Sequence, residues 1–293
     1  MRLDLASVLL QWGVGILAFL YITSRGRLVS LGYGWLLRGV GAVLLGGGLW
    51  ALLARDGSST ARDATAVLTA VAILGALGAL AVSVVRRGAG VRAVRARSAA
   101  RAERVAAMAG GAVGESIGTS TGDPDPGVPE FPPALDLVAP IAGVAALLAG
   151  AGTLGGPYAL TAYRLVVGAA FLGVLTDAML LGHWYLTQPG LPRGPIRELV
   201  RWAAPIWVLE VVGLLIPIGM VSVLTGSISD GYGGILAWMW AISAVSTGVL
   251  ILVTWLALKE RSYSAVMAAT GLLYLAILTG FGTDVLARAL LAP

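Results

Sequence analysis

The sequence predicts an all-α integral membrane protein, a polytopic bundle of about eight transmembrane helices with both termini on the non-cytoplasmic side. Apolar residues make up 58% of the 293 residues and charged residues only 12%, whereas a soluble domain carries about 25% charged residues. The mean hydropathy is +0.88. This chain has too little polar material to cover a water-facing surface, so most side chains must face lipid or one another.

Eight apolar stretches are long enough to cross the hydrocarbon core of a bilayer, which takes about 20 helical residues. The first stretch exceeds the apolar core of a signal peptide, about 7–15 residues, and no A-x-A cleavage site precedes the next polar segment. We therefore expect it to remain as a helix. The predicted spans are 5–23, 35–54, 64–85, 136–154, 160–182, 202–225, 234–257 and 263–282.

The basic residues alternate between the connections and so predict the orientation. Positive residues in short loops favour the cytoplasmic side of a membrane. Fifteen of the 20 cations belong to the first, third, fifth and seventh connections, which are therefore predicted to be cytoplasmic. An odd number of spans would break this alternation, so the pattern also supports eight. The fifteen are Arg25, Arg27, Arg38, Arg86, Arg87, Arg92, Arg95, Arg97, Arg101, Arg104, Arg193, Arg197, Arg201, Lys259 and Arg261.

A long polar interval divides the chain into a three-span segment, 1–85, a cytoplasmic interval, 86–134, and a five-span segment, 135–293. The part from Arg86 to Arg104 is rich in Ala and Arg and predicts a basic helix. Such a helix is expected to bind anionic lipids of the inner leaflet, at about 1 kcal/mol per basic residue, although a solvated topology signal explains it as well. Residues 110–134 predict a disordered, acidic Gly/Pro/Ser linker.

The composition also excludes several kinds of site and partner. The net charge of +5 and the pI near 9.9 do not indicate nucleic acid, because the basic residues lie in short segments between apolar runs. Without cysteine, and with a single histidine, the chain can form no thiolate metal site and no bis-His haem site. Known nucleotide-binding and hydrolase motifs are missing. We expect no metal, no cofactor and no nucleic-acid partner, and we leave open other membrane subunits besides the lipid bilayer.

Glu210 is the clearest candidate for chemistry within the membrane. It follows Arg201 by nine residues, about 13 Å along a helix axis, too deep for a short carboxylate to reach the headgroups. An ionisable group at such a depth costs at least about 2.5–3.5 kcal/mol. The carboxyl group must therefore be protonated, paired or in contact with water, which makes Glu210 a ligand- or proton-handling candidate.

Two prolines, Pro205 and Pro217, bracket Glu210 and are candidates for helix breaks. Each lacks an N–H group and frees the carbonyl group four residues earlier, those of Arg201 and Gly213. Within membranes such breaks persist where a neighbouring helix or a wet cavity satisfies the freed group. Broken helices often mark the binding sites of transporters, although a kink also serves packing alone.

Asp177 and His183 are two further ligand- or proton-handling candidates, near the end of the fifth predicted span. They are six residues apart and so lie on different faces of a helix, with Asp177 about 9 Å deeper. Because the next span starts on the same side, Glu210, Asp177 and His183 are all expected in the cytoplasmic half. Whether they meet in space is left open, and His183 beside Trp184 also fits an aromatic belt.

Three other charged residues near predicted span ends have simpler interpretations. Asp136 and Asp284 are expected to be solvated, and Arg164 is expected to extend its guanidinium toward the headgroups. On this interpretation none of them takes part in a site.

Four functional hypotheses follow for a multi-pass protein of a cell membrane, such as a bacterial inner membrane. The first is a small-solute transporter or permease in which Glu210 and Asp177 exchange protons as a kinked helix moves. The second is a quinone-contacting or proton-conducting membrane subunit of a respiratory or redox complex. The third is a membrane-embedded enzyme that acts on a lipid-phase substrate, for which the sequence offers no evident nucleophile or metal. The fourth is a structural or assembly factor, in which all intramembrane carboxylates would tolerate neutral replacement.

Overall fold

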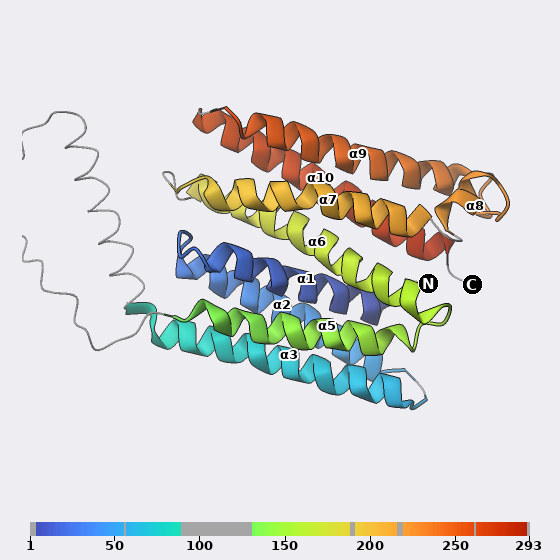
Figure 1. The fold of residues 1–293 in the computed structure, drawn as a ribbon, viewed down its shortest axis with the longest axis horizontal. Coiled ribbons are helices and arrows are strands. Elements are labelled where there is room, and N and C mark those ends of the chain that lie inside the picture. The colour runs from blue at the N-terminus through green and yellow to red at the C-terminus, as the bar shows by residue number, and fades with distance from the viewer. Residues whose placement is uncertain are drawn as a thin grey trace, which may run out of the picture.

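A computed structural model describes residues 4–55, 57–88, 131–187, 191–215, 219–260 and 262–291 as a bundle of helices that run side by side (Figure 1). Seven of the described helices are long and apolar enough to cross a membrane. The predicted polytopic all-α class is therefore confirmed. The seven are α1 (Leu5–Ser24), α2 (Leu31–Leu53), α3 (Thr60–Val85), η1 with α5 (Pro133–Leu137 and Val138–Ala151), α6 (Tyr158–Thr187), α9 (Ile235–Ala257) and α10 (Tyr263–Leu290).

The sixth predicted span, 202–225, is wrong in its bounds. Helix α7 covers Gly194–Leu215, and a short helix, α8, follows at Met220–Leu224. The start is earlier because a proline is tolerated in the first turn of a helix and the charged turns that follow it are helical as well. At Gly219 an added Cβ would lie 2.1 Å from the carbonyl oxygen of Leu214, so only glycine permits this close return of the chain. Helix α7 still runs beside α6 and α9, as an eighth long helix of the described bundle (Figure 1).

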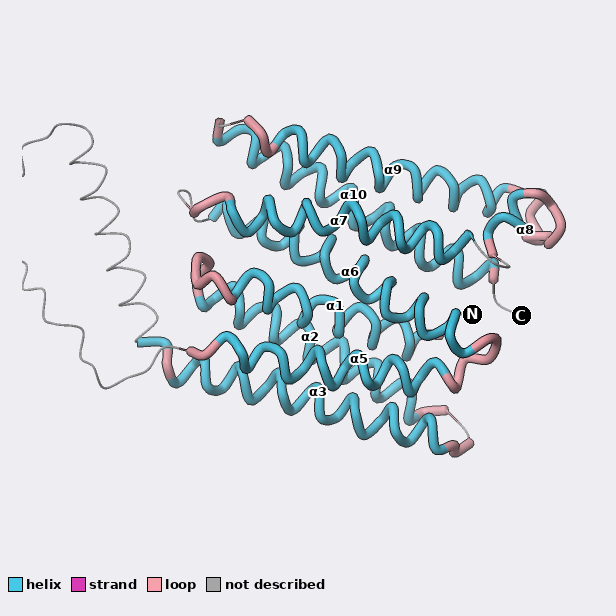
Figure 2. The backbone as a smooth tube through the Cα atoms, in the orientation of Figure 1, coloured by secondary structure: helices cyan, strands magenta, loops and turns pink. Residues whose placement is uncertain are grey.

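The connections between helices gather at the two ends of the bundle. The chain enters α1 and leaves α10 at one end (Figure 1). The α1–α2, α6–α7 and α9–α10 connections, which carry the basic residues, lie at the other end (Figure 2). This is the alternation that the arginine pattern predicts, and the cytoplasmic assignment of the basic end stays a prediction from that pattern. Beyond Gly88, the basic segment to Arg104 lies outside the described residues, as does linker 110–134 up to residue 130.

The eight long helices form two groups of four. In the first group α1, α2, α3 and α5 pack in a ring, each against the next and α5 against α1. In the second group α6, α7, α9 and α10 repeat the same order of contacts. Helix α5 thus follows the long polar interval in sequence but joins the first three spans in space.

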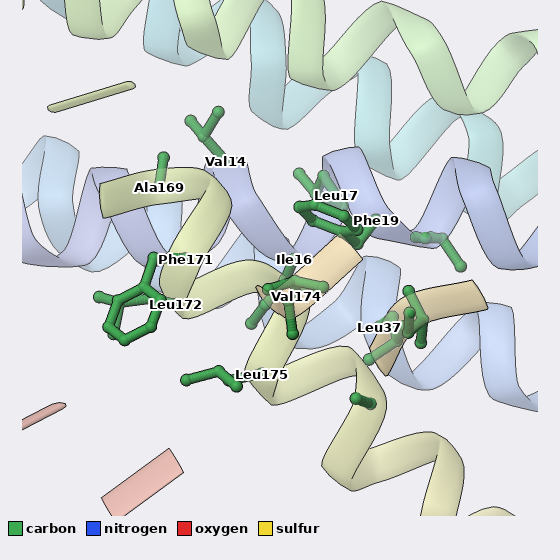
Figure 3. Close-up of a cluster of buried hydrophobic side chains, with 14 of the residues drawn as sticks. Val14, Ile16, Leu17, Phe19, Leu37, Ala169, Phe171, Leu172, Val174 and Leu175 are labelled. Carbon is green, nitrogen blue, oxygen red and sulfur yellow. The ribbon is translucent and has the colours of Figure 1, made fainter. Parts of the chain in front are cut away.

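The two groups meet mainly where α1 crosses α6, and glycines make this crossing close. An added Cβ at Gly15 would lie 1.9 Å from the carbonyl oxygen of Ala169, and one at Gly173 would lie 2.2 Å from the carbonyl carbon of Gly15. Small residues allow such backbone approach between helices in lipid. Around the crossing, buried side chains of the two helices, including Ile16 and Val174, fill the remaining space (Figure 3).

Asp230 fixes the start of α9, outside the spans. Its carboxylate accepts hydrogen bonds from the backbone N–H groups of Gly234 (2.8 Å), Tyr232 (2.9 Å), Leu236 (3.0 Å) and Ala237 (3.5 Å). These bonds, the one from Gly234 first, lower the pKa of Asp230 below its ordinary value. The charged form is therefore the one that the folded loop stabilises.

We expect the order at the start of α9 to depend on pH in the direction set by this lowered pKa. The stabilisation is complete above the ordinary Asp pKa of about 3.9 and is lost as the pH falls through the lower folded pKa. Asp230→Ala is expected to speed amide hydrogen exchange in residues 232–237 at neutral pH, whereas the wild type shows the same only in acid, after correction for intrinsic rates. Asp63→Ala, in the first turn of α3, is the control and should leave this segment unchanged. Equal exchange in Asp230→Ala and the wild type at neutral pH would contradict the assignment.

Candidate functional site

A buried polar cluster lies between helices of the two groups, toward the end of the bundle where α10 ends. Its members come from α1, α6, α7 and α10, and none of them is more than 7% exposed. Ionisable groups at such positions are costly in a membrane and need partners or a function. We call it the Glu210 cluster, and it consists of Ser7, Gln11, Arg164, Glu210, Asp284 and Arg288.

Arg288 is the best-satisfied member of the Glu210 cluster. Its Nε donates to Oδ2 of Asp284, one helical turn away, at 2.7 Å, and its Nη1 donates to Oγ of Ser7 at 3.0 Å. Its Nη2 donates to Oε1 of Gln11, whose Nε2 in turn donates to Oδ1 of Asp284 at 3.3 Å. Gly168 leaves the space for this link, since an added Cβ there would lie 2.0 Å from Nε2 of Gln11. Arg288 and Asp284 therefore form a closed, charge-balanced set with α1.

Glu210 and Arg164 form the unsatisfied side of the cluster. Glu210 is 2% exposed and interacts electrostatically with Asp284, Arg288 and Arg164. Neither Oε1 of Glu210 nor Nη2 of Arg164 has a hydrogen-bond partner in the described part of the chain. Buried polar atoms are nearly always hydrogen-bonded, so each orphan needs an explanation. An acceptor and a donor left open in one buried cluster provide polar contacts for a water molecule or a polar ligand group.

The carbonyl group of Gly213 shows how α7 is held near its end. Sequence analysis predicts that Pro217 frees this carbonyl, and the Nε of Arg164 donates to it at 2.8 Å. Pro217 itself lies outside the described residues, and α7 ends at Leu215. Pro205 lies within α7, which continues through it, and its side chain is on the outer face of the helix.

Asp177 is buried at a different level of the bundle. It is 0% exposed, and neither carboxylate oxygen has a hydrogen-bond partner among the residues that the structure describes. Its carbonyl oxygen accepts a hydrogen bond from the hydroxyl of Tyr33 at 3.0 Å. From Arg164 to Asp177, α6 rises about 20 Å, so Asp177 does not belong to the Glu210 cluster.

His183 is exposed and does not join the buried carboxyl groups. Its Nδ1 lies 3.5 Å from the hydroxyl of Tyr274, with the two rings edge to face and their centroids 6.5 Å apart. The expectation that Glu210, Asp177 and His183 share the cytoplasmic half is wrong for Glu210. Because α7 ends at Leu215 rather than at residue 225, Glu210 lies near the end of the bundle that is opposite the basic connections.

The residues that sequence analysis missed are the partners of Glu210. Asp284 is 0% exposed rather than solvated, and Arg164 is 6% exposed and turned inward rather than toward headgroups. One signal in the sequence was available: Asp284 and Arg288 are four residues apart, the spacing of a helical ion pair. The packing that brings α1, α6 and α7 to this pair has no comparable signal.

Asp136 forms a second buried ion pair, at the basic end. Arg38 is 2% exposed and binds Asp136 through two hydrogen bonds, from Nε to Oδ1 and from Nη2 to Oδ2, each of 2.8 Å. The hydroxyl of Ser24 also donates to Oδ2 at 2.9 Å, and the Phe131 ring lies 4.5 Å from the Arg38 guanidinium carbon. The expectation from sequence that Asp136 is solvated is therefore wrong, and Arg38 lies buried within α2 rather than in a loop. The pair ties α1, α2 and η1 together.

These features define a polytopic α-helical membrane protein with ionisable groups buried at several levels between its helices. Comparison of the chain with protein-family models, with curated proteins and with solved structures found no match. The geometry of the buried groups is therefore the basis for a functional proposal.

Proposed function

We propose that the protein is a proton-coupled transporter of a small polar solute in the cell membrane. The observation that carries the proposal is the open pair in the Glu210 cluster, where Oε1 of Glu210 and Nη2 of Arg164 lack partners among the described residues. A buried carboxyl group next to two arginines and a further carboxylate can change its protonation when a ligand or water changes its surroundings. Ionisable groups whose protonation is altered by burial and by neighbouring charges are common at functional sites.

The buried carboxyl groups of Glu210 and Asp177 lie at two levels of the bundle, which supports proton transfer across it. Glu210 lies toward the end where α7 finishes, and Asp177 lies deeper along α6 toward the basic end. Glu210 and Asp177 are too far apart to exchange a proton directly. The transporter hypothesis in its simplest form, in which the two residues exchange protons with each other, is therefore not supported. A transporter with two protonation sites instead requires water or a conformational change between them.

The alternatives receive less support from this arrangement. A quinone headgroup or a lipid-phase substrate handled jointly by Glu210, Asp177 and His183 would need the three side chains around one space. His183 is exposed beside Tyr274, and Asp177 lies about 20 Å along α6 from the level of Arg164.

Glu210→Gln is expected to abolish the pH dependence of transport while the protein still folds. Glutamine keeps the shape and an acceptor oxygen but cannot release a proton. Purified protein in vesicles would be exposed to a panel of amino acids, sugars and organic cations under an imposed pH gradient. Charge movement on a supported membrane and a pH-sensitive dye inside the vesicles would be recorded. For the solute that gives a signal, proton movement coupled to uptake is expected to be lost in the variant, because the amide releases no proton.

Glu198→Gln is the matched control, since Glu198 is a carboxylate on the same helix that pairs with Arg25 at the exposed basic end. Its transport and proton coupling should remain those of the wild type. Unchanged coupling in Glu210→Gln, or no response of the wild type to any solute of the panel, would discard the proposal.

A further inference from the structure

A groove between α7 and α9 opens toward the lipid. Its volume is about 650 Å³, within the range of about 300–1,000 Å³ that is usual for small-molecule pockets. The walls include Val208, Val249 and Leu252, which are 48%, 53% and 55% exposed, and the rings of Trp207 and Trp255. Of the described residues that line it, Arg201 alone is charged. An apolar ligand would therefore fit most of the groove.

The walls of the groove are held in place by specific contacts. The indole N–H of Trp207 donates to the carbonyl oxygen of Ala244 at 2.9 Å. Gly248 makes room for this ring, since an added Cβ there would lie 2.5 Å from Trp207 Cζ2. The groove is thus defined by specific packing of α7 against α9 and is not a gap between loosely packed helices.

Two cationic side chains lie at the end of the groove that is nearer the basic connections. The guanidinium of Arg201, in the second turn of α7, is exposed and makes no hydrogen bond or ion pair within the described ranges. The ammonium of Lys259, just beyond α9, lies 3.5 Å from the ring centre of Trp255, which lines the groove. Arg197 donates to the carbonyl oxygen of Leu258 through Nε (3.1 Å) and Nη2 (2.6 Å), and so fixes the segment that carries Lys259.

Arg201 also lines a polar pocket of about 510 Å³ between the end of α1 and the start of α7. Arg25 and Arg197 contribute further positive charge to this pocket, and Glu198 contributes one negative charge. The groove therefore ends, on the side of the basic connections, next to polar space with an excess of positive charge. This combination of an apolar groove and a cationic end matches the two parts of an anionic lipid.

We propose that the α7–α9 groove binds a phospholipid with an anionic headgroup, with an acyl chain along the groove and the phosphate at Arg201 and Lys259. Basic pockets between membrane helices on the cytoplasmic side bind such headgroups. None of the residues that form this site belongs to the Arg86–Arg104 segment or to the Glu210 cluster. The site does not depend on the proposed transport.

The test is lipid binding to the purified full-length protein, counted by native mass spectrometry. Phosphatidylglycerol and phosphatidylcholine with identical chains are titrated in detergent. Each basic residue is worth about fivefold, equivalent to about 1 kcal/mol, so the wild type should prefer phosphatidylglycerol by about 25-fold. Arg201→Gln should lower this preference about fivefold, and Arg201→Gln with Lys259→Gln should abolish it. Both side chains are exposed, so neither change leaves a buried charge.

Two further variants separate this site from general surface charge. Arg87→Gln removes one exposed cation at the same end of the bundle and should leave the preference unchanged. Ala204→Trp fills the groove, since Ala204 lines it, and should weaken both lipids alike. The proposal is overturned if the double variant keeps the wild-type preference, if Arg87→Gln lowers it as much as Arg201→Gln, or if a neutral long-chain quinone binds as tightly as phosphatidylglycerol.

Discussion

Arg38→Met is expected to lower the free energy of unfolding by about 3–5 kcal/mol, because it leaves Asp136 as an uncompensated buried charge. Asp136 is 4% exposed and, among the residues that the structure describes, would retain only the hydroxyl of Ser24 as a side-chain donor. Methionine approximates the volume of the arginine stem, so the loss should come from the charge rather than from a cavity. Unfolding in mixed detergent micelles, followed by helical circular dichroism, measures the effect.

The double variant Arg38→Met with Asp136→Leu provides the sharper comparison. Replacing both members of a buried ion pair by apolar residues is often neutral or stabilising, so stability should return to within about 1 kcal/mol of the wild type. Arg25→Met breaks the ion pair with Glu198, whose two side chains are 49% and 32% exposed, and should cost less than about 1 kcal/mol. If Arg38→Met lowered the free energy of unfolding by less than about 1 kcal/mol, the Arg38–Asp136 pair would be in contact with water rather than buried.

Gly173→Ala is expected to destabilise the protein by about 3 kcal/mol, at the upper end of the range for overpacking. Even one methyl group meets the backbone of Gly15 at 2.2 Å, and this backbone cannot rotate away as a side chain would. Helices α1 and α6 would have to separate, which loosens the main contact between the two four-helix groups. The same unfolding measurement applies.

Gly46→Ala is the matched control for this experiment. Gly46 lies within α2, and an added Cβ there meets no atom within 4 Å. Alanine in an open helical position is expected to stabilise by about 0.5–1 kcal/mol, so the two substitutions should have opposite signs. If Gly173→Ala were as harmless as Gly46→Ala, the close crossing of α1 and α6 would be incorrect.

The class and the order of the spans could be predicted from sequence because both depend on local composition. A stretch such as 234–257 exceeds the thickness of the hydrocarbon core without help from its neighbours, and the structure has α9 at Ile235–Ala257. The bounds around Glu210 could not be predicted in the same way. Apolar residues continue through 216–225, whereas α7 ends at Leu215 and the chain returns close to it at Gly219.

The candidate site was predicted only in part, for a related reason. Burial of Glu210 and Asp177 follows from their place inside apolar runs, and both are buried. Burial of Asp136 and Asp284 depends instead on partners that are distant in sequence, Arg38 for the first and Gln11 for the second. Position relative to a span end is therefore a poor guide to solvation when another helix supplies a donor.

The contacts of the Glu210 cluster have a mechanical consequence. Ser7 and Gln11 belong to one set of four helices, whereas Asp284 and Arg288 belong to the other. The hydrogen bonds that balance these charges therefore also join the two groups of four helices. Loss of these bonds would remove one connection between the two groups of helices and would leave the close crossing of α1 and α6 as the main contact that holds them together.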